Sequence, residues 1–193
     1  PAAMPIVEDN GTRVHFPESA ASREFTVTDA AGATRSLGDV DVVFPILHGP
    51  FGEDGTVQGL LELLALPYVG DGVLASALGM DKHFAKIAFQ AAGIPVAPGI
   101  TVTAREWATD AAAVAERVTG LGWPVFVKPA RAGSSVGVTR VTASGELAAA
   151  LDVALAEDSK ALVESAIVGR EIECGVLAGR DGGAPRVSLA GEI

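Results

Sequence analysis

The sequence predicts an α/β fold, and three observations support that class. Residues 41–47 form a nearly all-apolar run, which is typical of a strand buried on both faces of a sheet. A turn-rich loop follows at 48–55, and residues 56–66 then repeat apolar side chains at helical spacing before Pro67. Residues 68–69 give a further short strand. This strand–loop–helix–strand order indicates a parallel, Rossmann-like sheet in the first part of the chain.

Helices and strands continue to alternate through the rest of the chain. Asp81 is placed to cap a helix, and residues 103–106 fit a capping box. Residues 95–99 resemble a linker. The other expected elements are a short helix or turn at 75–80, helices at 82–92, 110–118 and 145–156, and strands at 125–127, 138–141, 161–164, 169–177 and 186–190.

Composition and charge exclude several classes of protein. The 193 residues carry 14 Lys and Arg against 24 Asp and Glu, a net charge of −10, and no basic cluster occurs, so we expect no nucleic-acid partner. The single cysteine excludes a disulfide framework. No His/Asp/Glu group has metal-ligand spacing, so no metal site is predicted here. We see no targeting signal or long apolar span, and we expect a cytoplasmic protein with no membrane partner.

Residues 125–141 carry the clearest chemical pattern. An apolar β-branched run brings Lys128 to the end of a strand, and a loop with Gly133, Ser134, Ser135 and Gly137 separates it from a second strand. The glycines allow the backbone to approach an anion, backbone N–H groups and hydroxyls can donate to it, and the lysine neutralises charge. The pattern therefore predicts a site for the phosphates of a nucleotide.

Other interpretations of this loop give different functions. Residues 133–137 formally match the hydrolase motif G-x-S-x-G, but that motif needs a helix after it, and a strand is predicted here. No Walker sequence G-x-x-x-x-G-K-[ST] occurs. An ordinary glycine-containing hairpin with a surface lysine remains open as an alternative.

Four further positions could bind a ligand. Lys82 lies in the first turn of its predicted helix, where a cation opposes the helix dipole, so a nearby phosphate would explain it. Glu164 and Glu171 lie at strand ends, where carboxylates can accept hydrogen bonds from ribose or adenine. His48 follows a predicted parallel strand at the edge where ligands bind. Each has a simpler alternative: a solvated lysine, a glutamate that is exposed or paired with Arg170, or a structural histidine.

Five segments, taken together and in order, resemble the D-alanine–D-alanine ligase family of ATP-grasp enzymes. They cover most of the chain from residue 41 onward, whereas residues 1–40 contain no motif that contributes. The segments are HGPFGEDG (48–55), GMDK (79–82), VKPARAGSSVG (127–137), GREIECGV (169–176) and GEI (191–193).

The resemblance implies a fold and a reaction. It implies a Rossmann-like N-terminal domain over residues 1–80, incomplete at its start, followed by part of an α+β ATP-grasp domain over residues 81–193. The family joins two D-alanine molecules at the expense of ATP and so supplies a precursor of peptidoglycan. The γ-phosphate passes to the carboxylate of the first D-alanine, and the amine of the second attacks the resulting acyl phosphate.

The resemblance also assigns roles to residues of this sequence. It places Lys82 and Lys128 at the ATP phosphates. It gives Ser134, Ser135 and Lys128 catalytic roles, with Ser134 and Ser135 in a loop that closes over the transferring phosphoryl group. Within that loop, Ser135 is expected to orient the substrate.

The nucleoside and the amino acids have their own expected contacts. Carried over by motif, Glu164 and the backbone of Ala166 and Ile167 meet adenine, and Glu171 meets ribose. The two positions expected beside the D-alanine pockets are His48 and Glu53.

Two departures from the family pattern affect these assignments. Many relatives have an acidic residue or glycine where this chain has Ala132. The family's magnesium (or manganese) ligands are expected beyond Ile193, and its N-terminal glycine-rich loop has no counterpart here, so we expect the chain to continue at both ends. The family also suggests a homodimer.

Three functions remain open at this point. The first is a ligase that joins two D-alanine molecules. The second is a related ligase that uses D-lactate or D-serine as the second substrate. The third is a nucleotide-binding fragment without activity, which would share Lys128 and Glu171 with the ligases but turn nothing over.

Overall fold

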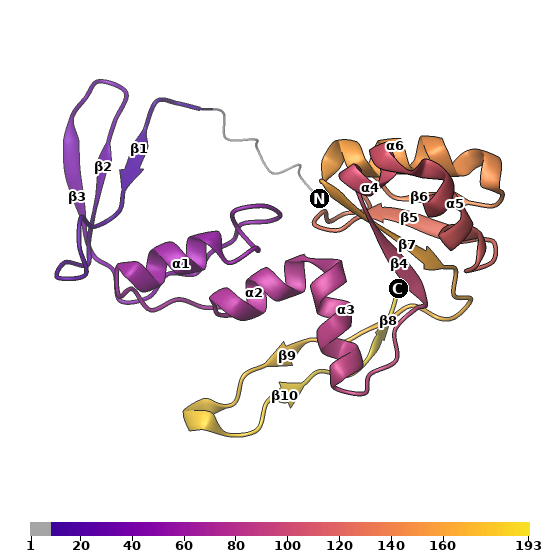
Figure 1. The fold of residues 1–193 in the computed structure, drawn as a ribbon. Helices are drawn as coiled ribbons and strands as arrows, with labels where there is room; N and C mark the ends of the chain where they lie inside the picture. The colour runs from indigo at the N-terminus through magenta and orange to yellow at the C-terminus, as the bar shows by residue number, and fades with distance from the viewer. Residues whose placement is uncertain (1–8) are drawn as a thin grey trace.

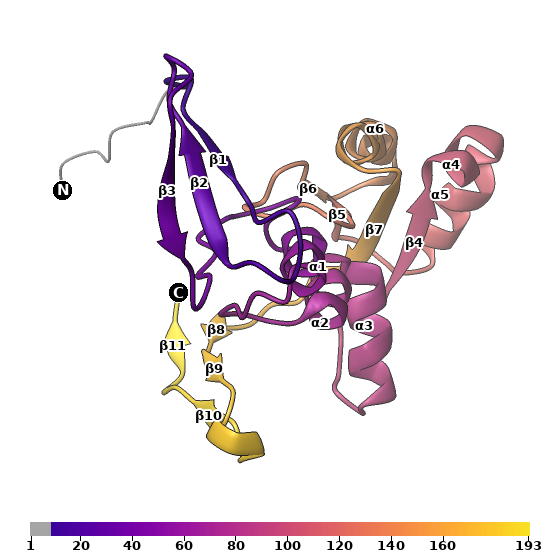
Figure 2. The ribbon, with the colours of Figure 1, turned by 90° about the vertical axis from the view of Figure 1, so that its left-hand side faces the viewer.

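The computed structural model describes residues 9–193, which form a three-stranded sheet, a four-stranded sheet and two short two-stranded sheets, together with helices (Figure 1). In Figure 1, helices α1 to α3 lie between the three-stranded sheet and the four-stranded sheet, and Figure 2 shows the same elements turned by 90°. The first part contains β1 (Arg13–His15), β2 (Glu24–Thr28), β3 (Thr34–Asp39), α1 (Thr56–Leu63), α2 (Val73–Met80) and α3 (Lys82–Ala91).

The second part begins with β4 and contains the larger core. Its elements are β4 (Gly99–Thr103), α4 (Ala104–Thr109), α5 (Ala111–Thr119), β5 (Val125–Pro129), β6 (Thr139–Val141), the 3₁₀ helix η1 (Ser144–Glu146), α6 (Leu147–Glu157) and β7 (Lys160–Ser165). Short elements follow: β8 (Ile172–Glu173), β9 (Val176–Leu177), η2 (Arg180–Gly182), β10 (Arg186–Val187) and β11 (Gly191–Glu192).

The N-terminal sheet was not predicted from the sequence. Its strands β1, β2 and β3 are antiparallel neighbours in that order. Phe25 of β2 packs in a small core with Leu61, Leu64 and Leu66 from α1 and the segment after it. All six residues of β3 are exposed, so its sequence carries no buried apolar alternation that would reveal a strand.

The strand expected at 41–47 does not form as predicted, although its expected parallel pairing with the segment at 68–69 is present at one position. Within the described residues this segment pairs only through a parallel bridge between Val43 and Tyr68. Phe44 and Ile46 are 68% and 75% exposed. An apolar run becomes a buried strand only where neighbouring strands pair with it, and residues 9–193 supply one short partner.

The four-stranded sheet has the order β4-β7-β5-β6, with every pairing antiparallel. Side chains from α5 and α6 cover one of its faces and form the larger core with the strands. Val125, Val127 and Val163 are fully buried in that core. Because successive side chains of a strand alternate between faces, Phe126, Lys128 and Glu164 must lie on the opposite face.

The predicted helices and caps are largely confirmed. Asp81 caps α3 by accepting hydrogen bonds from the N–H groups of His83 and Phe84. Thr103 and Glu106 form the capping box of α4. The expected linker at 95–99 is partly wrong, because β4 begins at Gly99 and runs to Thr103. The expected strands at 169–177 and 186–190 are shorter than predicted and fully exposed.

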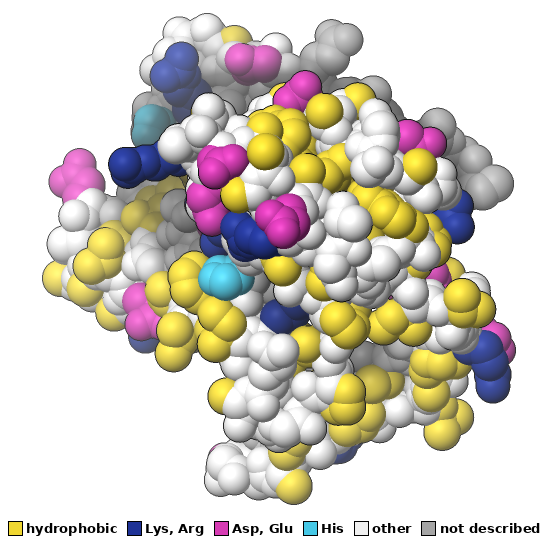
Figure 3. Space-filling model, turned by 45° about the vertical axis from the view of Figure 1, so that its right-hand side comes forward, with side chains coloured by type: hydrophobic (Ala, Val, Ile, Leu, Met, Phe, Trp, Pro, Cys, Tyr) yellow, Lys and Arg dark blue, Asp and Glu magenta, His cyan; other side chains and the backbone are white. Residues whose placement is uncertain are grey.

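The surface mixes charged and apolar side chains. On the face of the described residues shown in Figure 3, Lys and Arg side chains lie scattered among acidic and hydrophobic ones and form no continuous basic area. None of the helices within residues 9–193 combines the length and the hydrophobicity needed to cross a membrane.

Candidate functional site

One cleft on the open face of the central sheet brings together most of the predicted site residues. Its volume is about 510 Å³. Phe126 and Val138 give it an apolar surface. Six of the residues singled out from the sequence also line it: Lys82, Lys128, Ser134, Ser135, Glu164 and Ile167. Ammonium groups, hydroxyls and an apolar wall facing one space are the combination that a nucleotide's phosphates, sugar and base require.

The sheet register explains why Lys128 and Glu164 meet. Phe126 pairs with Glu164 across β5 and β7, so Lys128 lies diagonally across from Glu164 on the same face. Lys128 forms an ion pair with one Glu164 oxygen, and Lys86 from α3 forms an ion pair with the other. Glu164 is only 4% exposed, so these two cations offset the cost of burying its charge.

Lys82 reaches the same cleft from the beginning of α3. Its Nζ donates to the backbone oxygen of Ala132 at 2.5 Å. Burial, together with the positive charge of Lys128, lowers the pKa of Lys82 below its ordinary value of 10.5. Since the side chain of Ala132 is a methyl group, no carboxylate from this position pairs with Lys82. Within this loop, Lys82 is therefore bound only to the neutral carbonyl of Ala132, and its positive charge can attract an incoming anion.

The loop between β5 and β6 is strained at its two serines. Ser134 and Ser135 have φ angles of 49° and 59°, in the left-handed region that L-residues with a side chain seldom adopt. Each such residue costs on the order of 1 kcal/mol or more. The backbone strain therefore falls on the two serines that line the cleft.

Both ends of this loop are fixed. At its beginning, the backbone N–H of Arg131 donates to Asp158 at 2.9 Å, and its guanidinium donates to the same carboxylate at 3.1 and 2.7 Å. Burial alone would raise the pKa of Asp158, but the hydrogen bonds and charge of Arg131 outweigh it and hold that pKa below its ordinary value. At the end of the loop, Gly137 lies directly against Pro129. Residues 132–136 therefore lie between two fixed points.

Four predicted site residues do not line this cleft. The N–H of Ala166 already donates to the oxygen of Pro124 at 3.0 Å, which leaves only its carbonyl for a ligand. Glu171 is exposed and lies beyond the end of β7. Glu53 lines a second cavity, of about 410 Å³, and accepts a hydrogen bond from the Gly49 N–H at 2.5 Å. His48 begins the turn-rich loop 48–55 that contains Glu53, but it is not among the residues that line either cavity.

Two residues of the site were missed from the sequence. Lys86 lies four residues after Lys82, a spacing that places both on one face of a helix. Phe126 lies two residues before Lys128 on β5 and therefore shares its face. Both spacings were visible, but which face would border a cleft depends on how α3 docks on the sheet.

Comparison with known proteins gives this cleft a family context. Two family models match the chain: "D-ala D-ala ligase N-terminus" over residues 4–71 and "D-ala D-ala ligase C-terminus" over residues 88–193. The second model alone covers more than half of the chain. The chain belongs to the D-alanine–D-alanine ligase family.

Curated relatives agree with this membership. The chain is 56% identical over 192 residues to the D-alanine–D-alanine ligase of Paenarthrobacter aurescens, with 100% of the chain and 51% of that protein covered. It is 53% identical over 192 residues to the corresponding ligase of an Arthrobacter species, with 100% and 50% covered. The chain thus spans about half the length of these relatives.

Solved structures of the ligase family share the fold. The D-alanine–D-alanine ligase of Coxiella burnetii matches with a TM-score of 0.75 and 36% identity, over 88% of this chain and 58% of that one. The D-Ala:D-Ser ligase VanG of Enterococcus faecalis matches with a TM-score of 0.79 and 38% identity, over 93% and 49%. These matches confirm the predicted fold class, an α/β chain of the ATP-grasp type.

The anchor at Gly137 gives a test of the loop geometry. Gly137 has a φ of 69°, and a Cβ there would lie 2.7 Å from Cγ of the buried Pro129. We expect Gly137→Ala to destabilise the protein by about 1–3 kcal/mol, because the substitution adds both backbone strain and a clash. Urea unfolding of the full-length protein measures this change.

Gly133→Ala in the same loop is the matched control. A Cβ at Gly133 would meet no atom within 4 Å, and its φ lies outside the left-handed region. We expect a change below about 0.5 kcal/mol for this variant. Equal effects of the two substitutions would show that Gly137 does not anchor the loop.

Proposed function

We propose that this chain is the nucleotide-binding part of an ATP-dependent ligase that joins two D-alanine molecules. The observation that carries the proposal is the single cleft in which Lys82, Lys128, Ser134 and Ser135 face the same space. Two cations and two hydroxyls around one space suit a transferring phosphoryl group, whose catalysis depends on positioning and charge neutralisation.

Some of these side chains are proposed to bind the nucleotide, and others to take part in the reaction. Lys82 and Lys128 bind phosphate oxygens, and Phe126 and Ile167 pack against the base. Ser135 orients the first D-alanine carboxylate, which takes the γ-phosphate to become an acyl phosphate. The amine of the second D-alanine then attacks the acyl carbon, a C–N bond forms and phosphate leaves. The strained loop closes over this reaction and excludes water, which would otherwise hydrolyse the acyl phosphate.

The identity of the second substrate is supported by degree of similarity. The two curated relatives at 56% and 53% identity are D-alanine–D-alanine ligases, whereas the D-Ala:D-Ser ligase is 38% identical. We therefore propose D-alanine at both positions. We propose that the pocket for the ammonium group of D-alanine lies near the loop that contains His48 and Glu53.

The described residues do not fit a magnesium site. Within residues 9–193, no group of three or more His, Cys, Asp or Glu is arranged to hold a metal ion. The chemistry proposed for this chain is therefore assigned to its own side chains.

Domain division and assembly are also proposals. We propose a boundary near residues 80–81, supported by family models that match residues 4–71 and 88–193 separately. We propose a homodimer on the family resemblance, which analytical ultracentrifugation of the full-length protein would test.

The decisive experiment is phosphate release from ATP and magnesium by the full-length protein, with and without D-alanine. We expect release that depends on D-alanine, and a product with the mass of the dipeptide D-alanyl-D-alanine. Offering D-serine or D-lactate beside D-alanine identifies the second substrate by product mass. A folded full-length protein that binds ATP but shows no D-alanine-dependent release would refute the ligase.

Lys128 gives a test of the nucleotide site. We expect Lys128→Ala to weaken ATP binding by about 10- to 100-fold, because a phosphate loses one charged hydrogen-bond donor in a partly buried cleft. Calorimetric titration measures this loss. Arg105→Ala, which removes an exposed cation on α4, should leave affinity within about twofold.

Ser135→Ala separates binding from chemistry in the same assay. We expect it to lower turnover more than ATP affinity, because its hydroxyl is assigned to substrate orientation. Equal losses of turnover and ATP affinity would make Ser135 a binding residue. For the preceding test, unchanged ATP affinity in Lys128→Ala would show that Lys128 is not part of the nucleotide site.

The lowered pKa of Lys82 predicts an alkaline limit on ATP binding. Lys82 must be charged to bind phosphate, and its charge is lost as pH rises through a pKa that burial holds below 10.5. We expect ATP affinity to begin falling below that pH, and Lys82→Arg to move the fall to higher pH because arginine stays charged. Titrations across the alkaline range test this, and identical profiles for the two proteins would contradict it.

A further inference from the structure

The position of Lys82 depends on the beginning of α3. Lys82 is the first residue of that helix, and its backbone N–H donates to the oxygen of Ala130 at 3.0 Å. Its side-chain Nζ donates to the oxygen of Ala132 at 2.5 Å. Whatever fixes this end of α3 therefore fixes where the ammonium group can reach.

Asp81 fixes this end of the helix as its N-cap. Its Oδ1 accepts hydrogen bonds from the N–H groups of His83 at 3.0 Å and Phe84 at 3.3 Å. Asp81 is only 7% exposed, so its negative charge is largely removed from water. Its second oxygen, Oδ2, is not needed for the cap and is free to bind another group.

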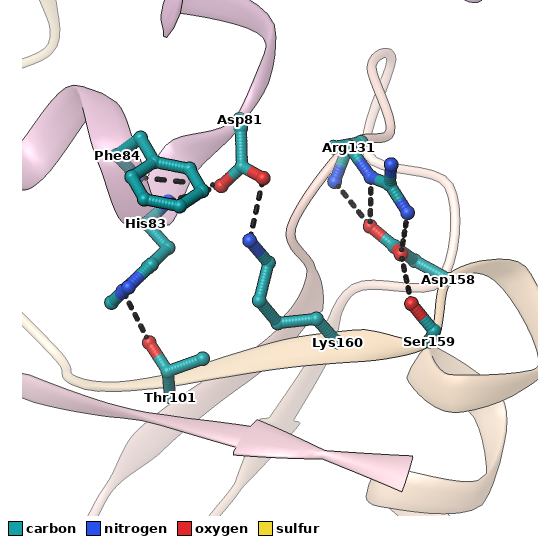
Figure 4. A network of polar contacts seen from close by, with 8 residues as sticks. All are labelled: Asp81, His83, Phe84, Thr101, Arg131, Asp158, Ser159 and Lys160. Atoms are coloured by element: carbon teal, nitrogen blue, oxygen red, sulfur yellow. Dashed lines mark hydrogen bonds and ion pairs between the residues drawn. The ribbon is translucent and has the colours of Figure 1, made fainter.

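Lys160 binds that second oxygen. Its Nζ lies 2.5 Å from Asp81 Oδ2 and 4.6 Å from the centroid of the Phe84 ring (Figure 4). The ammonium group thus contacts both a carboxylate and an aromatic face, and it is substantially shielded from solvent. Lys160 begins β7, an interior strand of the sheet, so its own backbone is held firmly.

These contacts close into a ring. The backbone oxygen of Lys160 accepts a hydrogen bond from the N–H of Ala130 at 2.9 Å, and the oxygen of Ala130 accepts one from the N–H of Lys82. Asp81 directly precedes Lys82 in the chain. The carboxylate of Asp81 binds the Lys160 side chain and so completes the ring. In this ring only the link between Asp81 and Lys160 joins two side chains. It can therefore be removed by substitution while the backbone links remain.

We infer that Lys160 is a positioning residue, which acts through Asp81 to hold Lys82 where it binds the nucleotide's phosphates. A buried ion pair contributes little net stability because desolvation offsets its attraction, so stability alone gives a weak reason for this pair. Lys160 does not line the cleft, so its effect on a ligand must pass through other residues. The inference rests on the proposed function, because it assigns phosphate binding to Lys82.

The test compares two ligands of the full-length protein. We expect Lys160→Met to weaken ATP binding by about tenfold, because a small displacement weakens charged hydrogen bonds. Adenosine, measured by ligand-observed NMR, should bind within about twofold of the unaltered protein, because it lacks phosphates. Lys160→Arg keeps the charge and should restore most of the ATP affinity. A general disruption of the fold would weaken both ligands.

A double substitution shows whether the effect passes through Lys82. If it does, adding Lys160→Met to Lys82→Met should weaken ATP binding by less than about twofold more. Arg117→Met, which breaks the exposed ion pair with Glu106, is the matched control and should leave ATP affinity unchanged. If Lys160→Met fails to fold, Asp81→Asn takes its place, because asparagine caps helices as well as aspartate does while the ion pair is lost.

The outcomes separate this inference from the proposed function. Unchanged ATP affinity in Lys160→Met, equal losses for ATP and adenosine, or losses that multiply in the double variant would each overturn the positioning role. If Lys82→Met and Lys128→Ala also leave ATP affinity unchanged, then the cleft is not the nucleotide site, and the proposed function fails together with the inference.

Discussion

The alternation of side chains along the two interior strands, β5 and β7, is the constraint on which the rest of the structure depends. One set of residues, including Val127 and Val163, faces α5 and α6 and forms the core. The intervening set, including Lys128 and Glu164, must then face the other way. The burial that stabilises the sheet therefore also decides which functional groups share the cleft.

The arrangement of charge follows from this constraint. The sequence has a net charge of −10 and contains four lysines, which are Lys82, Lys86, Lys128 and Lys160. Lys82 and Lys128 line the cleft, and Lys86 forms an ion pair with Glu164, which also lines it. An acidic molecule can thus attract an anion without a broad positive surface, because its ammonium groups converge from α3 and β5 on one partly buried space.

Among the residues that line the cleft, backbone strain is confined to one short loop. The loop after β5 is held at Arg131 by the buried carboxylate of Asp158 and at Gly137 by close packing on Pro129. Between these points Ser134 and Ser135 adopt left-handed backbone conformations. This strained backbone is thus confined to a short segment outside the sheet that positions Lys128. The polar contacts in Figure 4, made by Asp81, Arg131, Asp158 and Lys160, belong to the fixed part of this arrangement.

The sequence by itself determined the elements whose signals are local. The helix caps at Asp81 and Thr103, and the strand that ends near Lys128, could be read from residues within one or two turns of each other. The same local patterns marked Lys82 and the serines as candidates for phosphate binding. The strand-end position marked Glu164 as well, and family motifs then added Ile167; both share the cleft with them.

Only the tertiary structure decided which segments pair as strands and which side chains distant in the sequence come into contact. Residues 41–47 are apolar enough for a strand, yet they pair at one position because strand pairing needs a partner that local sequence does not supply. Lys86 with Glu164, and Lys160 with Asp81, join residues 78 and 79 positions apart. Such contacts depend on how α3 docks against the sheet, and docking is set by the packing of whole surfaces, which no local pattern in the chain records.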